Sequence, residues 1–247
     1  MKISFIITFF VLSTIIATPS TTFAETFKLG IPVSSSNNIV AALGEIYTEA
    51  FERFGQTAEI VSCSPSYCAS FVRDGRLDGE GARHAKYGEL YPHVERIEFV
   101  LFKLTSVAIT KREVSNISNL NEFKLRNYKV AYQIGYRGYE KRLSRLLNRD
   151  KFVSVAHWKE GILKVKNDQV DTFLAVKQIL LSENSMSDFP QIKIHDLQDF
   201  VIDIHPFVSG KLLPYKAELL SSLNKMREKR RVTQIFRKHA VPIDALL

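Results

Sequence analysis

The chain of 247 residues carries 34 basic and 26 acidic side chains, which gives it a formal net charge of +8. This length is sufficient for one large or two modest domains. Beyond the first 24 residues, no apolar stretch is long enough to cross a membrane. The basic excess is compatible with an anionic ligand, an anionic membrane surface or simple solubility.

The first 24 residues have the pattern of a secretory signal peptide. Lys2 precedes an apolar run over residues 3–17, and the small residues Thr22 and Ala24 lie at the expected cleavage site. A transmembrane anchor is the alternative, but the run is short for a membrane span. We therefore expect a soluble, monomeric protein in the periplasm, cleaved after about Ala24. Its formal charge is then +7, because Lys2 is the only charge lost from +8, and an exported protein rarely meets nucleic acid.

The mature chain alternates strand and helix patterns. Apolar residues at every second position predict strands, and apolar residues three and four positions apart predict helices. Strands are expected at 27–32, 57–61, 77–78, 98–102, 104–110, 129–132, 152–155, 170–176, 192–194 and 200–204. Helices are expected at 39–54, 65–73, 140–148, 158–165, 177–185, 214–229 and 232–238. This alternation is typical of parallel sheets covered by helices.

The helix over residues 65–73 has the clearest boundaries. Ser64 is a suitable N-cap, a proline occupies the first helical position, and Gly75 stands just past the end. Residues 77–78 then form a short strand, which the segment 79–81 ends. Polar residues therefore follow a strand end, where ligands bind in open α/β sheets.

Cys63 and Cys68 are the only cysteines of the chain, and an oxidising compartment favours their pairing. In the predicted helix they occupy the two positions that touch in a hydrophobic staple. A disulfide there would close a short loop and give local rigidity more than global stability. A metal-binding pair or a redox centre is the alternative, although no histidine set and no CxxC spacing accompanies the two residues.

Two β-rich regions, near 102–110 and 200–206, separate two consecutive α/β series. We therefore predict two lobes that the chain crosses twice. Residues 25–105 with 207–247 form the first lobe, and residues 106–206 form the second. A ligand site between the lobes follows from this arrangement.

Seven segments, taken in order, carry a resemblance to a known family. They are Phe27-Lys-Leu-Gly-Ile, Arg73-Asp-Gly-Arg-Leu-Asp-Gly-Glu-Gly-Ala-Arg83, Tyr91-Pro-His-Val-Glu-Arg-Ile, Ile117-Ser-Asn-Leu, Tyr128-Lys-Val-Ala-Tyr-Gln-Ile-Gly, Val170-Asp-Thr-Phe-Leu-Ala and Leu212 to Arg227. Together they resemble the periplasmic solute-binding proteins of the amino-acid-binding type, bacterial extracellular solute-binding protein family 3. The resemblance covers nearly all of the mature chain.

The resemblance implies an α/β fold of the two-lobed type II kind. Each lobe is then a mostly parallel sheet flanked by helices, and two hinge strands join the lobes. The implied function is capture of a small polar ligand, anionic or amino-acid-like, for the membrane subunit of an ABC importer or for a sensor. We expect neither a cofactor nor enzyme activity.

The sequence departs from the family at three positions that contact the amino-acid ligand in family members. The segment 33–38 has no aromatic residue, although the family usually has one there. The strand position that is often acidic in the family looks like Val176 here. The usual Thr-Thr pair after the second-lobe glycine is replaced by Tyr136 and Arg137.

Candidate ligand-binding residues come from both expected lobes. Arg83 suits an anion because its guanidinium bonds carboxylates in a bidentate way, but it could instead be a surface residue paired with Glu80 or Glu89. Glu80 could orient Arg83 or bind a ligand amine. The first-lobe candidates are Arg83, Glu80, Ser34, Ser36 and Tyr67, although residues 34–38 also read as an ordinary N-cap cluster.

The second-lobe candidates are Gly135, Tyr136 and Arg137. They precede a helix, so their backbone N–H groups could cradle an anion, but turns need glycine in any case. The six histidines do not form a metal-binding pattern. The basic run 225–231 is interpreted as the solvated face of a terminal helix.

Two alternatives belong to other functional classes. An enzyme on the same scaffold, such as a dehydratase, needs a general acid or base in the cleft, and Glu80 is the one obvious candidate. A partner-binding module that has lost its ligand is the second alternative. The spacing of residues does not identify a Ser-His-Asp or a Cys-His catalytic arrangement.

Overall fold

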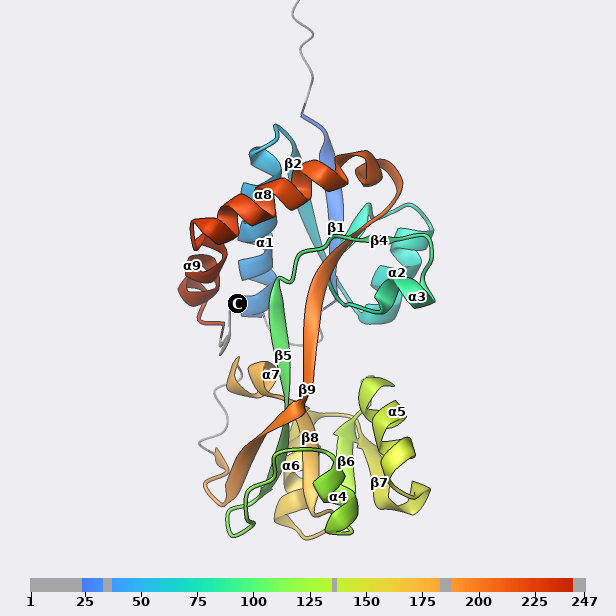
Figure 1. The fold of residues 1–247 in the computed structure, drawn as a ribbon, viewed down its shortest axis with the longest axis vertical. Coiled ribbons are helices and arrows are strands. Elements are labelled where there is room, and N and C mark those ends of the chain that lie inside the picture. Colours follow the sequence, from blue (N-terminus) through green and yellow to red (C-terminus); the bar gives the residue numbers. More distant parts are fainter. Residues whose placement is uncertain (1–23, 33–36, 135–136, 183–187, 242–247) are drawn as a thin grey trace, which may run out of the picture.

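The computed structural model describes residues 24–32, 37–134, 137–182 and 188–241. Figure 1 shows two lobes joined by two long neighbouring strands, β5 (Phe102–Lys111) and β9 (Ile192–Val208). Each lobe has a sheet with helices against its faces, as the α/β two-lobed expectation requires. Within the described residues, no helix has both the length and the apolar character needed to span a lipid bilayer.

The first lobe is built from both ends of the chain. Its N-terminal elements are β1 (Thr26–Pro32), α1 (Asn37–Glu52), β2 (Thr57–Cys63), α2 (Pro65–Arg73), β3 (Gly79–His84), α3 (Tyr87–Leu90) and β4 (Glu95–Arg96). Its C-terminal elements are η3 (Gly210–Tyr215), α8 (Lys216–Glu228) and α9 (Arg231–Lys238). The strand order is β2-β1-β3-β9, in which β1 is parallel to β2 and β3, and β9 is antiparallel to β3.

The second lobe is built from the middle of the chain. After β5 come α4 (Asn121–Leu125), β6 (Val130–Gln133), α5 (Arg137–Leu146), η1 (Arg149–Lys151), β7 (Phe152–Val155), α6 (Trp158–Lys166), β8 (Thr172–Val176) and α7 (Lys177–Ser182). The strand order is β9-β5-β8-β6-β7, and β6 is parallel to both β7 and β8. The strands of both lobes belong to one sheet, because β9 pairs with β3 on one side and with β5 on the other.

Separate hydrophobic cores stabilise the two lobes. The first-lobe core joins apolar side chains of α1 and β1 to those of α8 and α9, including Leu43, Phe51, Leu223 and Phe236. In the second lobe, one core cluster contains Phe123 and Leu143 and another contains Ile162 and Phe173. Burial of these side chains is the main favourable contribution to folding. The sequence boundaries proposed for the lobes stay a prediction.

The strand predicted at residues 77–78 is wrong. The strand β3 starts at Gly79 and runs through the segment that was expected to end it. A Cβ atom at Gly79 would collide with the carbonyl oxygen of Phe207, and one at Gly81 would collide with Ile31 and Tyr47. Glycine is required here because neighbouring groups approach closely, whereas its usual appearance in turns suggests a strand end.

The two strands predicted at 192–194 and 200–204 are one strand, β9. The polar segment between them, His195 to Asp199, was assigned to neither strand. His195 is nevertheless buried, and Asp196 pairs with Val107 of β5. The ladder with β5 reaches the first two residues of this stretch, since His195 pairs with Ala108 and Asp196 with Val107.

Candidate functional site

The parallel strands of both lobes end at the junction between the lobes. In Figure 1, β1 and β3 run down toward the second lobe, while β6 and β8 run up toward the first. Ligands of open α/β sheets bind at the carboxyl ends of the strands. The two groups of strand ends are therefore the two walls of the candidate site.

The first-lobe wall depends on a β-bulge in β3. Glu80 pairs with Phe207 and Arg83 pairs with His205, so two residues of β3 face one residue of β9. Residues three apart on a regular strand point to opposite faces. The extra residue reverses that alternation, and the side chains of Glu80 and Arg83 consequently meet. Bulges are common beside functional sites because they redirect side chains in this way.

Glu80 and Arg83 form a closed hydrogen-bond network with α2 and α3. The Arg83 Nε–H donates to Glu80 Oε2, and the Tyr87 hydroxyl donates to Glu80 Oε1. The Arg83 Nη2 group donates to the carbonyl oxygen of Pro65 at 2.6 Å. The guanidinium carbon lies 4.4 Å from the centre of the Tyr87 ring, which is a cation–π geometry. Glu80 is 0% exposed and the side chain of Arg83 is 11% exposed.

The electrostatics of this network follow from its burial. Burial raises the pKa of the Glu80 carboxyl, while the charge and the hydrogen bond of Arg83 and the hydrogen bond of Tyr87 act to lower it. Burial and the nearby carboxyl of Glu80 raise the pKa of the Tyr87 hydroxyl, which therefore keeps the proton that it donates. The Nη1 group of Arg83 makes no hydrogen bond within the described part of the chain. It is the donor that the network leaves available to a ligand.

The predicted disulfide is present between Cys63 and Cys68, whose Cα atoms are 5.5 Å apart. It joins the end of β2 to the first turn of α2 and encloses Pro65, whose carbonyl holds Arg83. Ser64 precedes the helix as expected, but its side chain makes no capping hydrogen bond. The disulfide therefore holds the start of α2 in place, a role that the Ser64 side chain does not fill.

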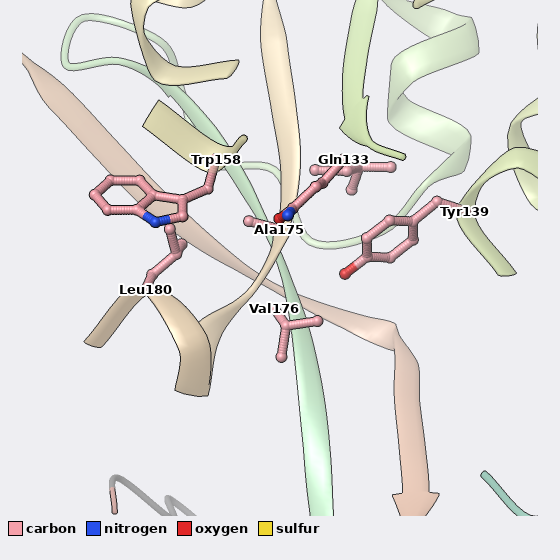
Figure 2. A pocket seen from close by; sticks show the side chains of 7 residues that line it. Gln133, Tyr139, Trp158, Ala175, Val176 and Leu180 are labelled. Atoms are coloured by element: carbon pink, nitrogen blue, oxygen red, sulfur yellow. The ribbon is translucent and has the colours of Figure 1, made fainter. Parts of the chain in front are cut away.

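The second-lobe wall contains a small pocket, which Figure 2 shows. Its lining side chains come from the ends of β6 and β8 and from α5, α6 and α7: Gln133, Tyr139, Trp158, Leu174, Ala175, Val176 and Leu180. The cavity volume is about 10 Å³, close to the space that one water molecule needs. None of these described lining residues is charged. The wall is therefore apolar and aromatic, with one amide.

Gln133 supplies the amide group of this pocket. Figure 2 shows its side-chain amide near Ala175, between Trp158 and Tyr139. Within the described residues the amide has no hydrogen-bond partner. An amide has two donors and an acceptor, so it can bind either kind of polar atom on a ligand.

Comparisons with solved structures show which fold carries this site. The chain matches a substrate-binding protein of an amino acid ABC transporter at 14% identity and a TM-score of 0.63, over 86% of this chain and 98% of that one. It matches an ancestral arginine-binding protein bound to arginine at 14% identity and a TM-score of 0.65, over 87% and 98%. A histidine kinase sensor domain with similarity to periplasmic binding proteins matches at 13% identity and a TM-score of 0.66, over 87% and 96%.

The chain has the two-lobed fold of periplasmic binding proteins. No protein-family model and no curated protein matches the sequence. The fold expected from the seven resembling segments is therefore confirmed by the structural likeness, at a sequence identity that supports the fold alone.

On this binding-protein fold, the predicted first-lobe residues are only partly brought together. Arg83 and Glu80 are in contact and buried, whereas the alternative interpretation placed a paired Arg83 on the surface. Tyr67 lies near the start of α2, is 64% exposed, and contacts Phe71. Ser34 and Ser36 lie outside the described residues. Ligand contacts by all of these residues stay predictions.

In the second lobe, Arg137 begins α5 and its side chain lies outside the described structure. Gly135 and Tyr136 lie outside the described residues as well. Val176 ends β8 and lines the pocket, at the strand end where the family often has an acidic residue. Its apolar side chain leaves this wall without a carboxylate among the described lining residues.

Several site residues were missed by sequence reasoning. Tyr87 lies seven positions after Glu80, with no periodicity to link them, and its hydroxyl reaches Glu80 from the start of α3. Gln133 could have been found, since it is the polar residue that ends an apolar strand. Trp158 was identified only as the start of a helix. No cluster of three or more metal-binding side chains occurs among the described residues.

Proposed function

We propose that the protein is a periplasmic solute-binding protein that encloses a small polar ligand between its lobes. The observation that carries this proposal is that the parallel strands of both lobes end toward the junction, so that each lobe offers one wall. The first wall is a buried network of Glu80, Arg83 and Tyr87, and the second is the uncharged pocket around Gln133. A ligand in contact with both walls would stabilise the closed arrangement, because it gains hydrogen bonds from both at once.

The ligand class follows from the charges of the two walls. An ammonium group against the second lobe would meet apolar and aromatic side chains, with no carboxylate among the described residues of the pocket to compensate it. Arg83 offers its Nη1 donor, and Arg137 begins a helix in the opposite lobe. We therefore propose an organic anion or an atypical amino-acid derivative, held by charge-assisted hydrogen bonds.

The binding role is tested by mass spectrometry of small molecules carried through native purification, followed by calorimetry with each compound found. Stoichiometric binding of an unchanged compound supports the proposal. Absence of binding across carried compounds, carboxylic acids and amino acids would contradict it, and would favour the partner-binding alternative.

The anion preference is tested with Arg137→Ala and Arg83→Ala. Each variant should weaken binding by about 1.5–3 kcal/mol, the range for hydrogen bonds to charged groups. Arg76→Ala is the matched control, because Arg76 is an exposed arginine that contacts Asp74 and Phe71, away from this network. Unchanged affinity in both site variants would contradict the anion preference. Tight binding of plain cationic amino acids to the parent protein would contradict it as well.

The partner and the location complete the proposal. Proteins of this fold include a substrate-binding protein of a transporter and a kinase sensor domain, so we propose delivery to an ABC importer or to a sensor. The pattern of residues 1–24 supports export. N-terminal sequencing of the periplasmic protein should find its first residue near Glu25, and an uncleaved N-terminus would contradict the signal peptide.

An enzyme is a less favoured second candidate. Its general acid or base would be Glu80, but this carboxyl is fully buried and both of its oxygens accept hydrogen bonds. A substrate would have to displace Arg83 or Tyr87 to reach it. Chemical conversion of the bound compound, lost in Glu80→Gln, is the result that would favour the enzyme.

A further inference from the structure

The two strands that join the lobes are not paired continuously. Thr105 of β5 pairs with Val201 of β9, and Val107 pairs with Asp196. Two steps along β5 therefore correspond to five along β9, and the regular register is lost at Ser106. This interruption lies where β5 begins to pair with the second-lobe strand β8, at Ser106. A ladder without regular backbone hydrogen bonds resists bending less than a continuous one.

Gln178 lies beside this interruption and is only 2% exposed. It is the second residue of α7, immediately after β8 ends at Val176, which pairs with Ser106. Beyond that pair, β8 no longer lies along β5. The next backbone groups on this edge of β5 consequently need other hydrogen-bond partners, because buried peptide groups are almost always paired.

The side chain of Gln178 supplies those partners. Its Oε1 accepts a hydrogen bond from the Thr105 N–H at 3.1 Å, and its Nε2 donates to the carbonyl oxygen of Lys103 at 3.2 Å. A primary amide presents the same donor and acceptor as a peptide group. The side chain thus continues the β8 ladder along β5 for two more residues, past the point where the backbone turns into α7.

A second side chain holds the same stretch. The Tyr139 hydroxyl of α5 donates to Ser106 Oγ at 3.1 Å, and both groups are buried. Tyr139 also lines the second-lobe pocket, as does Val176, two residues before Gln178. Elements that form the pocket are therefore bonded directly to residues 103–106 of the connecting strand.

We propose that Gln178 is a positioning residue that holds residues 103–105 of β5 to the second lobe. With this amide in place, the lobes hinge on the first-lobe side of Lys103 and not at the interrupted register of Ser106. The role in ligand capture rests on the proposed function, since the hinge matters only if the lobes close on a ligand. The location of the hinge is independent of it.

Hydrogen exchange on the ligand-free protein tests the proposal without any ligand. In Gln178→Leu, the Thr105 amide loses its acceptor, so its exchange should become about tenfold faster or more. Amides within the β6–β8 ladder, such as those of Tyr132 and Leu174, should exchange as in the parent. Gln178→Glu keeps an acceptor for Thr105 but places a carboxylate beside the Lys103 carbonyl, and it should protect the Thr105 amide better than the leucine variant.

Gln234→Leu is the matched control, because it removes an exposed glutamine from α9 in the first lobe. Unchanged exchange at Thr105 in Gln178→Leu would overturn the proposal. Equal acceleration throughout the second lobe would also overturn it, because it would indicate general loss of stability. X-ray scattering of the ligand-free leucine variant should show a broader range of molecular dimensions than the parent, and an identical profile would count against the hinge position.

Discussion

Glu80 and Arg83 are brought together by one extra residue in β3. Without the bulge, their side chains would lie on opposite faces of the sheet. In the structure they form a buried ion pair, and the anion-binding role of Arg83 stays a prediction. Removing one partner of such a pair leaves an uncompensated buried charge, whereas removing both can cost little.

We predict that Glu80→Gln lowers the free energy of unfolding by about 3 kcal/mol, because Arg83 keeps its charge without a carboxylate. Glu80→Gln combined with Arg83→Met should lose less than the sum of the two single variants. Urea unfolding of the three variants and the parent gives this double-mutant cycle. Additive losses would mean that the two side chains do not interact energetically.

His195 is a second buried polar residue with a defined proton position. Its Nδ1 accepts from the Ile117 N–H at 3.3 Å, so the proton of the neutral ring is on Nε2, which faces Thr110 Oγ1 at 2.8 Å. Burial lowers the pKa of His195, and the charges of Lys193 and Arg126 act in the same direction while Glu122 opposes them. Protonation would add a hydrogen to Nδ1, where it would face the hydrogen of the Ile117 N–H group.

The sign of the resulting pH dependence follows from that lowered pKa. Below about pH 6.5 the unfolded chain binds a proton at this site before the folded protein does. The stability that His195 contributes is therefore complete above that pH and is lost as the pH falls toward the lowered value. Unfolding free energies at pH 7.5 and 5.5 should differ less in His195→Gln than in the parent, and an equal difference in both would contradict this role.

At the scale of elements, the entry into α2 is held by a covalent bond and not by a serine cap. The disulfide closes a loop of five residue steps, which is short. By the chain-entropy estimate such a loop contributes about 2 kcal/mol. Its position matters more than its length, since it encloses the carbonyl that accepts from Arg83.

We predict that the double variant Cys63→Ser, Cys68→Ser loses about 2 kcal/mol of unfolding free energy or less, and that hydrogen exchange increases first in α2. The parent treated with a reductant should behave in the same way, and the same reductant should leave the double variant unchanged. Faster exchange spread over both lobes, with α2 no different from the rest, would show that the bond does not act locally.

Much of the element pattern follows from the sequence, because strands and helices of the parallel layers have clear apolar periodicity. The helices α2 and α6 and the strands β2 and β7 begin where their caps and periodicity indicate. The burial of single apolar side chains follows less closely, since within α6 Ile162 is buried while its neighbour Leu163 is 44% exposed. Short elements such as α4, without a distinct apolar face, were missed.

The candidate site was less predictable for a physical reason. The contacts of Arg83 depend on a bulge, and those of Gln178 depend on the strand register between lobes. Both are tertiary features that no local pattern encodes. The disulfide was predictable because its two partners lie within one turn of a helix start.

At the scale of the molecule, a ligand that binds the folded protein alone must stabilise it. At a free ligand concentration one hundred times the dissociation constant, the gain should be about 2.7 kcal/mol. Scattering should show a smaller radius of gyration in the complex if the lobes close. A compound that raises the unfolding temperature without changing the radius would indicate binding to one lobe without closure.

The first lobe has a consequence for the order in which the protein folds. Its core needs α8 and α9 against α1, and Arg231 of α9 forms ion pairs with Glu45 and Glu49 of α1. These partners are separated by more than 180 residues of chain, so bringing them together is slow compared with local pairing. The second lobe is contiguous in sequence and can assemble as soon as β9 has emerged. A chain emerging from its N-terminus therefore completes its first-lobe core last, when its final helices arrive.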